Sequence, residues 1–326
     1  MRRIQIKIWP EIDAQYPAII PVERIKRNKL NPIDIDFSNA NKVTSSGLNI
    51  LLINLIKLAS DLINREWDTI TPKDKKIEEM IRNMNFYKIL IEKAPNQNLF
   101  WQVEALKEKT LSPLELNFYN GNIRKIIYPI YELDFVSGKK DKRAIVNEFK
   151  NYLIEQLFYL QEKYDFELSV FIQVLIEMAK NSADHTENNA YFGLDITNND
   201  KFIKIQFSFG DLGPGINQSI RKFIREEKKL FKEKEKHLAL TDSYHYALQV
   251  GTTTKPNSKM NKGIGMSTIF NLSKQIEFNL SVYDAESRGF LSYAVTNSHV
   301  ELRKIFYNIG FKVGFYYYGE IEISLL

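Results

Sequence analysis

The chain has 326 residues, 44% of them hydrophobic, and a formal net charge of +5. It is long enough for about two domains with real hydrophobic cores. It has no cysteine and four dispersed histidines, which excludes disulfides and Cys-based zinc sites and argues against a His-only metal site. No run approaches the ~20 apolar residues of a membrane helix, and residues 1–10 lack the apolar core of a signal peptide. We therefore expect a cytoplasmic protein with no membrane partner, and the mild positive charge does not by itself indicate nucleic acid.

The N-terminal third alternates between strand-like and helix-like segments. Residues 4–9 alternate as in a strand, and residues 33–37 are a second strand candidate. Apolar residues recur at helical spacing over 48–63, where Ser45 or Ser46 would cap the helix, and again over 75–90. This alternation predicts a small α/β layer.

Residues 36–47 read DFSNANKVTSSG. This segment is similar to the STAS domain of anti-sigma-factor antagonists, in which an Asp precedes the Ser-Ser-Gly; here Thr44 stands in its place. Residues 81–90 resemble that family's last helix. The resemblance implies a STAS-like α/β domain over residues 1–95. It also makes Ser45 the match to a serine that accepts phosphate from a GHKL serine kinase. Because the Asp of that pattern is missing, a helix N-cap at Ser45 is the favoured alternative.

A proline-marked stretch over 93–113 follows and predicts a domain boundary. Beyond it, residues 114–118 and 123–131 look like two strands around Asn120-Gly121, a favoured tight-turn pair. Residues 142–164 form a long helix pattern. We expect residues 96–130 to connect the first domain to a second one over 131–326.

The segment 169–185, SVFIQVLIEMAKNSADH, reads as one helix. Gln173, Glu177, Asn181 and Asp184 fall on one stripe of that helix, and Glu177 and Asn181 point the same way because they are one turn apart. A carboxylate and a carboxamide so placed can share one cation or one water. The alternative is an ordinary amphipathic helix with its polar side in water.

Two strands are expected next, over 190–196 and 201–209, and the second delivers Asp211 at its end. A carboxylate there would accept a hydrogen bond from an exocyclic amine and so select adenine over guanine. Gly213 and Gly215, in the stretch FGDLGPGI, would let the chain turn tightly beneath the base. A glycine turn after a strand is the plain alternative.

A second glycine-rich stretch, NKGIGMST at 261–268, precedes a helix pattern that runs to about residue 272. Gly263, Ile264, Gly265 and Met266 would expose backbone N–H groups there, a suitable site for phosphates. The upstream residues 251–255, GTTTK, offer hydroxyls and a Lys that would reach a terminal phosphate, or they form a polar loop.

Together the three blocks resemble the nucleotide-binding domain of the GHKL superfamily. The resemblance implies a Bergerat fold, a sandwich of helices on a mixed, mostly antiparallel sheet, with ATP and Mg²⁺ as cofactors. It makes Glu177 the general base for water and Asn181 the Mg²⁺ ligand. Asp184 and His185 would contact water around the phosphates or the base, although His185 also suits a helix C-terminus. The expected ATP-binding residues are Asn181, Asp184, His185, Asp211, Gly213, Gly215, Ile216, Gly251, Thr252, Thr253, Lys255, Gly263, Ile264, Gly265, Met266 and Thr268.

The remaining segments are less specific. We expect a charged helix over 221–236, strands over 275–283 and 289–295, an aromatic-rich insertion over 299–318, and a terminal strand over 320–326.

The leading functional hypothesis is a Mg²⁺-dependent ATP-binding switch that hydrolyses ATP slowly in a regulatory or defence system, with a protein partner or a second copy of itself. One alternative is a serine/threonine kinase of the partner-switching type, acting on a STAS-like partner or on Ser45. The other alternative is a non-catalytic, nucleotide-gated scaffold.

Overall fold

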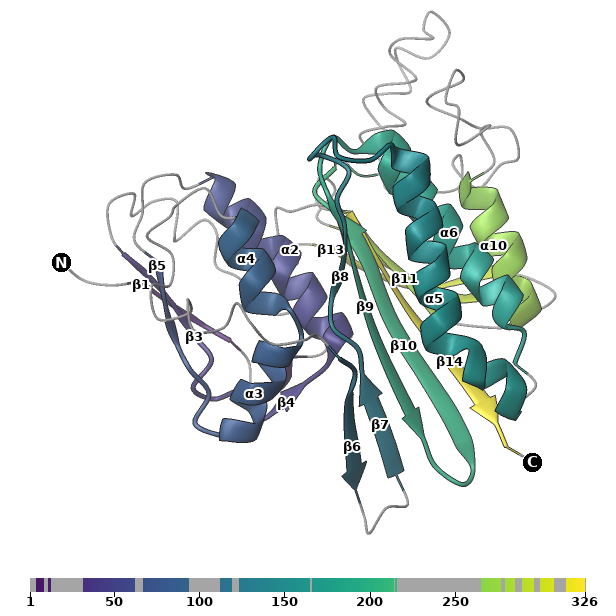
Figure 1. Ribbon diagram of the computed structural model, residues 1–326, viewed down its shortest axis with the longest axis horizontal. Helices are drawn as coiled ribbons and strands as arrows, with labels where there is room; N and C mark the ends of the chain where they lie inside the picture. Colours follow the sequence, from purple (N-terminus) through teal and green to yellow (C-terminus); the bar gives the residue numbers. More distant parts are fainter. Residues whose placement is uncertain are drawn as a thin grey trace, which may run out of the picture.

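The computed structural model describes residues 4–8, 11–12, 32–61, 67–93, 112–118, 123–164, 166–213, 215, 265–276, 279–284, 289–295, 300–307 and 315–325. These residues form a mixed α/β protein with a small N-terminal layer and a large sheet (Figure 1). None of the described helices is long and apolar enough to cross a membrane.

The N-terminal layer is built on parallel strands. β1 (Ile4–Lys7), β3 (Ile33–Asp36) and β5 (Trp67–Ile70) form a three-stranded parallel sheet, and the two-residue strands β2 (Glu11–Ile12) and β4 (Lys42–Val43) pair separately. The helices of this layer are α2 (Ser45–Asp61), α3 (Lys75–Asn83) and α4 (Phe86–Lys93). The predicted small α/β layer is therefore present.

The single helix expected over 75–90 is wrong, because α3 and α4 are separate helices. Asn85 lies between them with φ of 64°, a left-handed conformation that interrupts a right-handed helix and that Asn tolerates better than most residues. Asp74 caps the start of α3, since its carboxylate accepts a hydrogen bond from the Lys76 backbone N–H at 2.8 Å.

The large sheet has nine strands in the order β13-β12-β11-β14-β10-β9-β7-β6, with β8 also paired to β9. All of its described pairings are antiparallel. This confirms the predicted class, helices with a mostly antiparallel sheet. The strands are β6 (Leu114–Phe118), β7 (Ile123–Ile127), β8 (Tyr131–Leu133), β9 (Ala190–Asn198), β10 (Phe202–Asp211), β11 (Asn279–Asp284), β12 (Gly289–Val295), β13 (Val300–Tyr307) and β14 (Phe315–Ser324).

Two segments join this sheet that the sequence placed elsewhere. β6 and β7 come from the stretch expected to connect two domains, yet β7 pairs directly with β9. The aromatic-rich insertion expected over 299–318 is wrong, because that stretch holds β13 and the first residues of β14. Tyr316 and Tyr317 are fully buried there, since β14 lies between β10 and β11 and its aromatic side chains become core.

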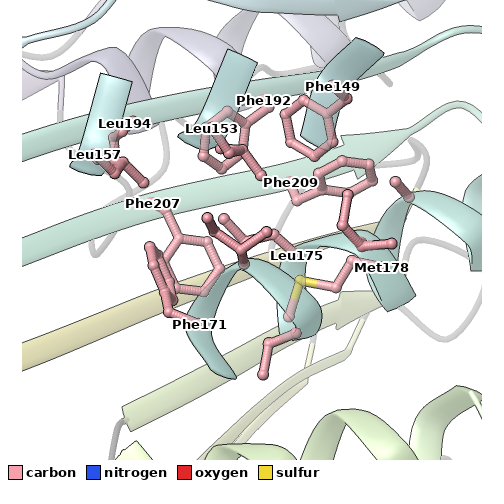
Figure 2. Packing of buried hydrophobic residues seen from close by; sticks show 14 of the residues in the cluster. Phe149, Leu153, Leu157, Phe171, Leu175, Met178, Phe192, Leu194, Phe207 and Phe209 are labelled. Carbon is pink, nitrogen blue, oxygen red and sulfur yellow. The ribbon is translucent and has the colours of Figure 1, made fainter. Parts of the chain in front are cut away.

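Three helices cover one face of the large sheet: α5 (Lys142–Tyr164), α6 (Leu168–His185) and α10 (Gly265–Ile276). Figure 2 shows how α5 and α6 present their apolar side chains to the sheet residues Phe192, Phe207 and Phe209. The helix side chains labelled there are Phe149, Leu153, Leu157, Phe171, Leu175 and Met178. Burying each such side chain contributes about 1.5–3 kcal/mol, so this cluster fixes α6 on the sheet.

Helix α2 covers the opposite face, where it packs against β9 and β10 (Figure 1). Its sequence is apolar nearly all round, which is typical of a helix buried on every side. α4 packs against its other side. Ile127, Ile130 and Tyr191 of the large-sheet region belong to the same hydrophobic cluster as the N-terminal layer, so the two regions share a core.

Candidate functional site

The end of β10 and the last turns of α6 meet at one place. The Ser182 hydroxyl of α6 donates a hydrogen bond to Asp211 Oδ2 at the end of β10. Asn181 is the preceding residue of the helix, and Glu177 lies one turn earlier. The structure thus brings the helix that carries the predicted metal ligand and base to the predicted purine-binding acid.

Asp211 is a buried acceptor, 5% exposed. Its second oxygen, Oδ1, accepts a hydrogen bond from the Gly213 backbone N–H at 2.7 Å. Burial raises its pKa to about 6, although the bonds from Ser182 and Gly213 act in the opposite direction. A buried carboxyl group that changes its charge this close to neutral pH is typical of a functional site.

Tyr317 of β14 is a third member of this group that the sequence analysis missed. Burial raises the pKa of its phenol, the nearby Asp211 charge raises it further, and a side-chain hydrogen bond with Asn181 lowers it. Tyr317 therefore lies close enough to Asn181 and Asp211 to be influenced by both side chains. It was missed because the aromatic run around it was assigned to an insertion.

The sequence analysis did not identify Ser182 either, because Ser182 lies outside the polar stripe of α6. It lies one turn beyond Met178, on the side of the helix that the core buries. A hydroxyl within that apolar stripe was the available signal, since buried polar side chains are nearly always hydrogen-bonded to a specific partner.

The residues of the polar stripe of α6 differ in how far they are exposed to solvent. Gln173 is exposed, whereas Glu177 is only 8% exposed. The Glu177 carboxylate pairs with the Lys180 ammonium at 2.7 Å, within the same helix. Asp184 and His185 are half-buried in the last turn.

The C-terminal end of α6 is held by α5. The Lys142 ammonium donates hydrogen bonds to the carbonyl oxygens of Ala183 and, at 3.3 Å, Thr186. A cation at this position also suits the negative end of the helix dipole. Asn181 to His185 are therefore carried by a helix end that is fixed on both sides, by the sheet and by Lys142.

The two glycines after Asp211 are required for different reasons. A Cβ on Gly213 would lie 2.7 Å from Asp211 Oδ1 and 3.1 Å from Thr186 Cβ, so a larger residue there would have to displace the Asp211 carboxylate. Gly215 has φ of 77°, which favours glycine. Gly213 is therefore packed closely against Asp211, and Gly215 supplies a left-handed backbone position.

Part of the predicted site lies outside the described residues. This applies to Ile216, Gly251, Thr252, Thr253, Lys255, Gly263 and Ile264, and also to the charged helix expected over 221–236. Gly265 and Met266 are the first two residues of α10, where Thr268 is half-buried, and α10 packs against α6.

A divalent cation would have few protein ligands here. Among the described residues, no group of three His, Asp or Glu side chains could hold a metal ion. The carboxamide oxygen of Asn181 is the expected ligand. A single protein oxygen fits Mg²⁺ that keeps several waters and is carried by phosphate groups, rather than Mg²⁺ in an all-protein cage.

Ser45 lies at the start of α2, on the opposite face of the sheet from α6. It is fully buried, and its hydroxyl accepts a hydrogen bond from the Leu194 backbone N–H at 3.3 Å. The N-cap is Thr44 rather than Ser45 or Ser46, because the Thr44 hydroxyl accepts from the Gly47 N–H at 3.0 Å. Thr44 thus performs a structural role at the position where the STAS pattern has Asp.

No family model, curated protein or solved structure matches the chain. Function must therefore be argued from the site. The site contains the buried carboxylate of Asp211, which can accept a hydrogen bond from a ligand. The neighbouring helix carries the Asn181 carboxamide and the Glu177 carboxylate, one helical turn apart.

Proposed function

We propose that the protein is a Mg²⁺-dependent ATP-binding protein of the GHKL type, a slow ATPase that acts as a nucleotide-driven conformational switch in a regulatory or defence system. The observation that carries this proposal is the bond between Ser182 of α6 and Asp211 of β10. It joins the helix bearing Glu177 and Asn181 to the glycine turn after β10, two segments that the sequence predicts to share one nucleotide.

Adenine recognition follows from the surroundings of Asp211. Its two oxygens already accept bonds from Ser182 and Gly213, and each carboxylate oxygen has a further lone pair. An exocyclic amine would use one of these, whereas the carbonyl of guanine would face a buried acceptor. Leaving such a group unpaired costs about 1–3 kcal/mol or more, so we expect preference for ATP over GTP.

Residues of α6 would bind the phosphate end of the nucleotide. Asn181 would hold Mg²⁺ bound to the phosphates, and Glu177 would orient or deprotonate a water aimed at the γ-phosphate. The proposed fold of this region is the Bergerat sandwich, and that of the N-terminal layer is STAS-like. The N-terminal layer would then act as the module that reports the nucleotide state to a partner.

The first prediction separates binding from hydrolysis. In the wild-type protein, Mg-ATP at a hundredfold excess over Kd should stabilise the fold by about 2.7 kcal/mol, and Mg-GTP should not. Asp211→Ala should abolish the stabilisation, because the purine loses its acceptor. Glu177→Ala should keep it while ATP turnover is lost. Thermal unfolding and phosphate release measure the two effects.

Two outcomes would contradict this proposal. Equal stabilisation by ATP and GTP would remove the role of Asp211, and wild-type turnover by Glu177→Ala would remove the role of Glu177. Glu155→Ala on the exposed side of α5 is a control that also deletes one carboxylate. It should change neither readout.

The ion pair between Glu177 and Lys180 favours a second candidate, the non-catalytic nucleotide-gated scaffold. An ammonium 2.7 Å from the carboxylate competes with any water for that oxygen. The same measurements decide: stabilisation by Mg-ATP without turnover in the wild type identifies the scaffold. A kinase acting on Ser45 in cis is disfavoured, because α2 would first have to leave the sheet.

A further inference from the structure

A fully buried polar network joins α2 to the back of the large sheet. Ser45, Ser46 and Asn49 come from the first turns of α2, and Asp195 and Ser208 come from β9 and β10; each is 0% exposed. An interface held only by packing would be apolar here, as most of α2 is. Polar groups so deeply buried are stable only when specific partners satisfy their hydrogen bonds.

Asp195 supplies the centre of the network. Its Oδ1 accepts from the Ser45 backbone N–H at 2.8 Å, and its Oδ2 accepts from the Ser46 N–H at 3.0 Å and the Ser46 hydroxyl at 2.9 Å. Free N–H groups at a helix start suit an anion. Here the anion comes from a strand some 150 residues later in the chain.

The network continues to β10 through Asn49 and Ser208. The Asn49 amide donates to the Ser208 hydroxyl oxygen at 3.0 Å and to the Tyr191 carbonyl at 3.1 Å, and the Ser208 hydroxyl donates to the Ser46 carbonyl at 3.0 Å. The close approach needs Gly193, because a Cβ there would lie 2.6 Å from the Ser45 carbonyl oxygen. α2 therefore has one register on these two strands.

The same strand carries the candidate site. Ser208 is three residues before Asp211 in β10, and their side chains lie on opposite faces: Ser208 contacts α2, and Asp211 contacts α6. A shift of β10 that alters Asp211 also alters the bonds of Ser208. Because each group is desolvated, a partly broken network leaves unpaired polar atoms, so the network tends to break as a unit.

We infer that Asp195 is a positioning residue that latches the N-terminal layer onto the sheet, and that this latch and the nucleotide site are coupled through β10. The coupling rests on the proposed function; the latch does not. By thermodynamic reciprocity, a nucleotide that favours one position of β10 strengthens the docking of α2, and a loosened α2 weakens nucleotide binding by the same factor.

Hydrogen–deuterium exchange of the full chain tests the latch without any nucleotide. Asp195→Asn keeps the shape but loses the charge, and it should speed exchange of the α2 amides at least about tenfold while those of α10 keep the wild-type rate. Asn54→Ala is the matched control, because Asn54 is a buried amide of the same helix that donates to the Ile50 carbonyl within it. Equal exchange in the two variants, or a wild-type rate in Asp195→Asn, would overturn the latch.

Ser46→Ala is the milder variant and tests the latch if Asp195→Asn does not fold. We expect it to increase the exchange rate of the same α2 amides by a smaller factor.

The second arm adds Mg-ATP, which should slow exchange of the α2 amides in the wild type and should slow it less in Ser46→Ala. An unchanged α2 rate in wild-type protein whose melting temperature Mg-ATP raises would overturn the coupling alone. A melting temperature that Mg-ATP does not raise would count against the proposed function, and the nucleotide-free rates would still decide the latch.

Discussion

Asp211 is oriented by groups on both sides of its carboxylate: the Ser182 hydroxyl bonds to one oxygen and the Gly213 backbone N–H to the other. A methyl group at position 213 would lie 2.7 Å from Asp211 Oδ1. The carboxylate would have to rotate away, and its bond with Ser182 would be lost or lengthened.

We therefore predict that Gly213→Ala weakens Mg-ATP binding by tenfold or more while the protein stays folded, because the clash falls on a single side chain. Gly138→Ala is the control: it places the same methyl group at a left-handed φ of 67° but in open space, so it should cost stability without changing affinity. Calorimetric titration measures both. Unaltered affinity in Gly213→Ala would show that Asp211 does not depend on this turn.

The pKa of Asp211 gives a second prediction at this scale. The folded value of about 6 lies above the ordinary 3.8, so the folded protein holds this proton more tightly than the unfolded chain does. The group's contribution to stability is complete below about pH 4 and is lost as the pH rises to about 6. An amine donor instead needs the ionised carboxylate.

Adenosine binding should therefore weaken below pH 6, by up to about tenfold per pH unit. Adenosine is the appropriate probe because it carries no phosphate whose charge changes in this range. Asp211→Asn should bind more weakly but with no pH dependence. A flat profile in the wild type would show that the ionised carboxylate is not the acceptor.

How far the sequence predicts the site depends on where each signal lies. Local sequence is enough to identify Glu177, Asn181 and Asp211. The first two are spaced by one helical turn, and the third follows a strand pattern. Ser182 and Tyr317 do not: a buried serine reads as an apolar helix face, and a tyrosine in an aromatic run has no visible partner. Their roles arise only when β14 and α6 are placed beside β10.

At the scale of elements, β14 is the strand on which the large sheet depends, since it lies between β10 and β11. Gly319 is directly opposite Phe207 of β10. A Cβ on Gly319 would lie 2.2 Å from the Phe207 ring, which fills the space above the strand.

Gly319→Ala should therefore destabilise the protein by about 1–3 kcal/mol or more, the usual range for overpacking a core. Phe207→Leu combined with Gly319→Ala should recover part of this loss, because the smaller side chain leaves room for the methyl group. Urea unfolding gives the free energies. Simple additivity of the two changes would argue against direct contact.

Element boundaries follow the same logic as the site residues. The helix pattern over 142–164 and the strand over 289–295 match α5 and β12 residue for residue, because polar residues flank each segment on both sides. β5, β13 and the start of β14 were not anticipated. Their strand character depends on neighbours that come from distant parts of the chain, which no local window contains.

At the scale of the molecule, the least predictable feature is the position of the N-terminal layer. Its helix α2 was expected to belong to a separate domain with its own serine cap. Instead, Asp195 of β9 satisfies the first N–H groups of α2, and Gly193 leaves room for its backbone. A pairing between residues so far apart leaves no periodic trace in either segment.

The place of β14 has a consequence for biosynthesis. The strands on its two sides, β10 and β11, are translated earlier and are not hydrogen-bonded neighbours in the described sheet. While the chain is still on the ribosome, one part of the sheet can gather around α2 and α6 and the other around β11 to β13. The two parts unite, and Tyr317 comes near Asp211, only after residues 315–324 have emerged.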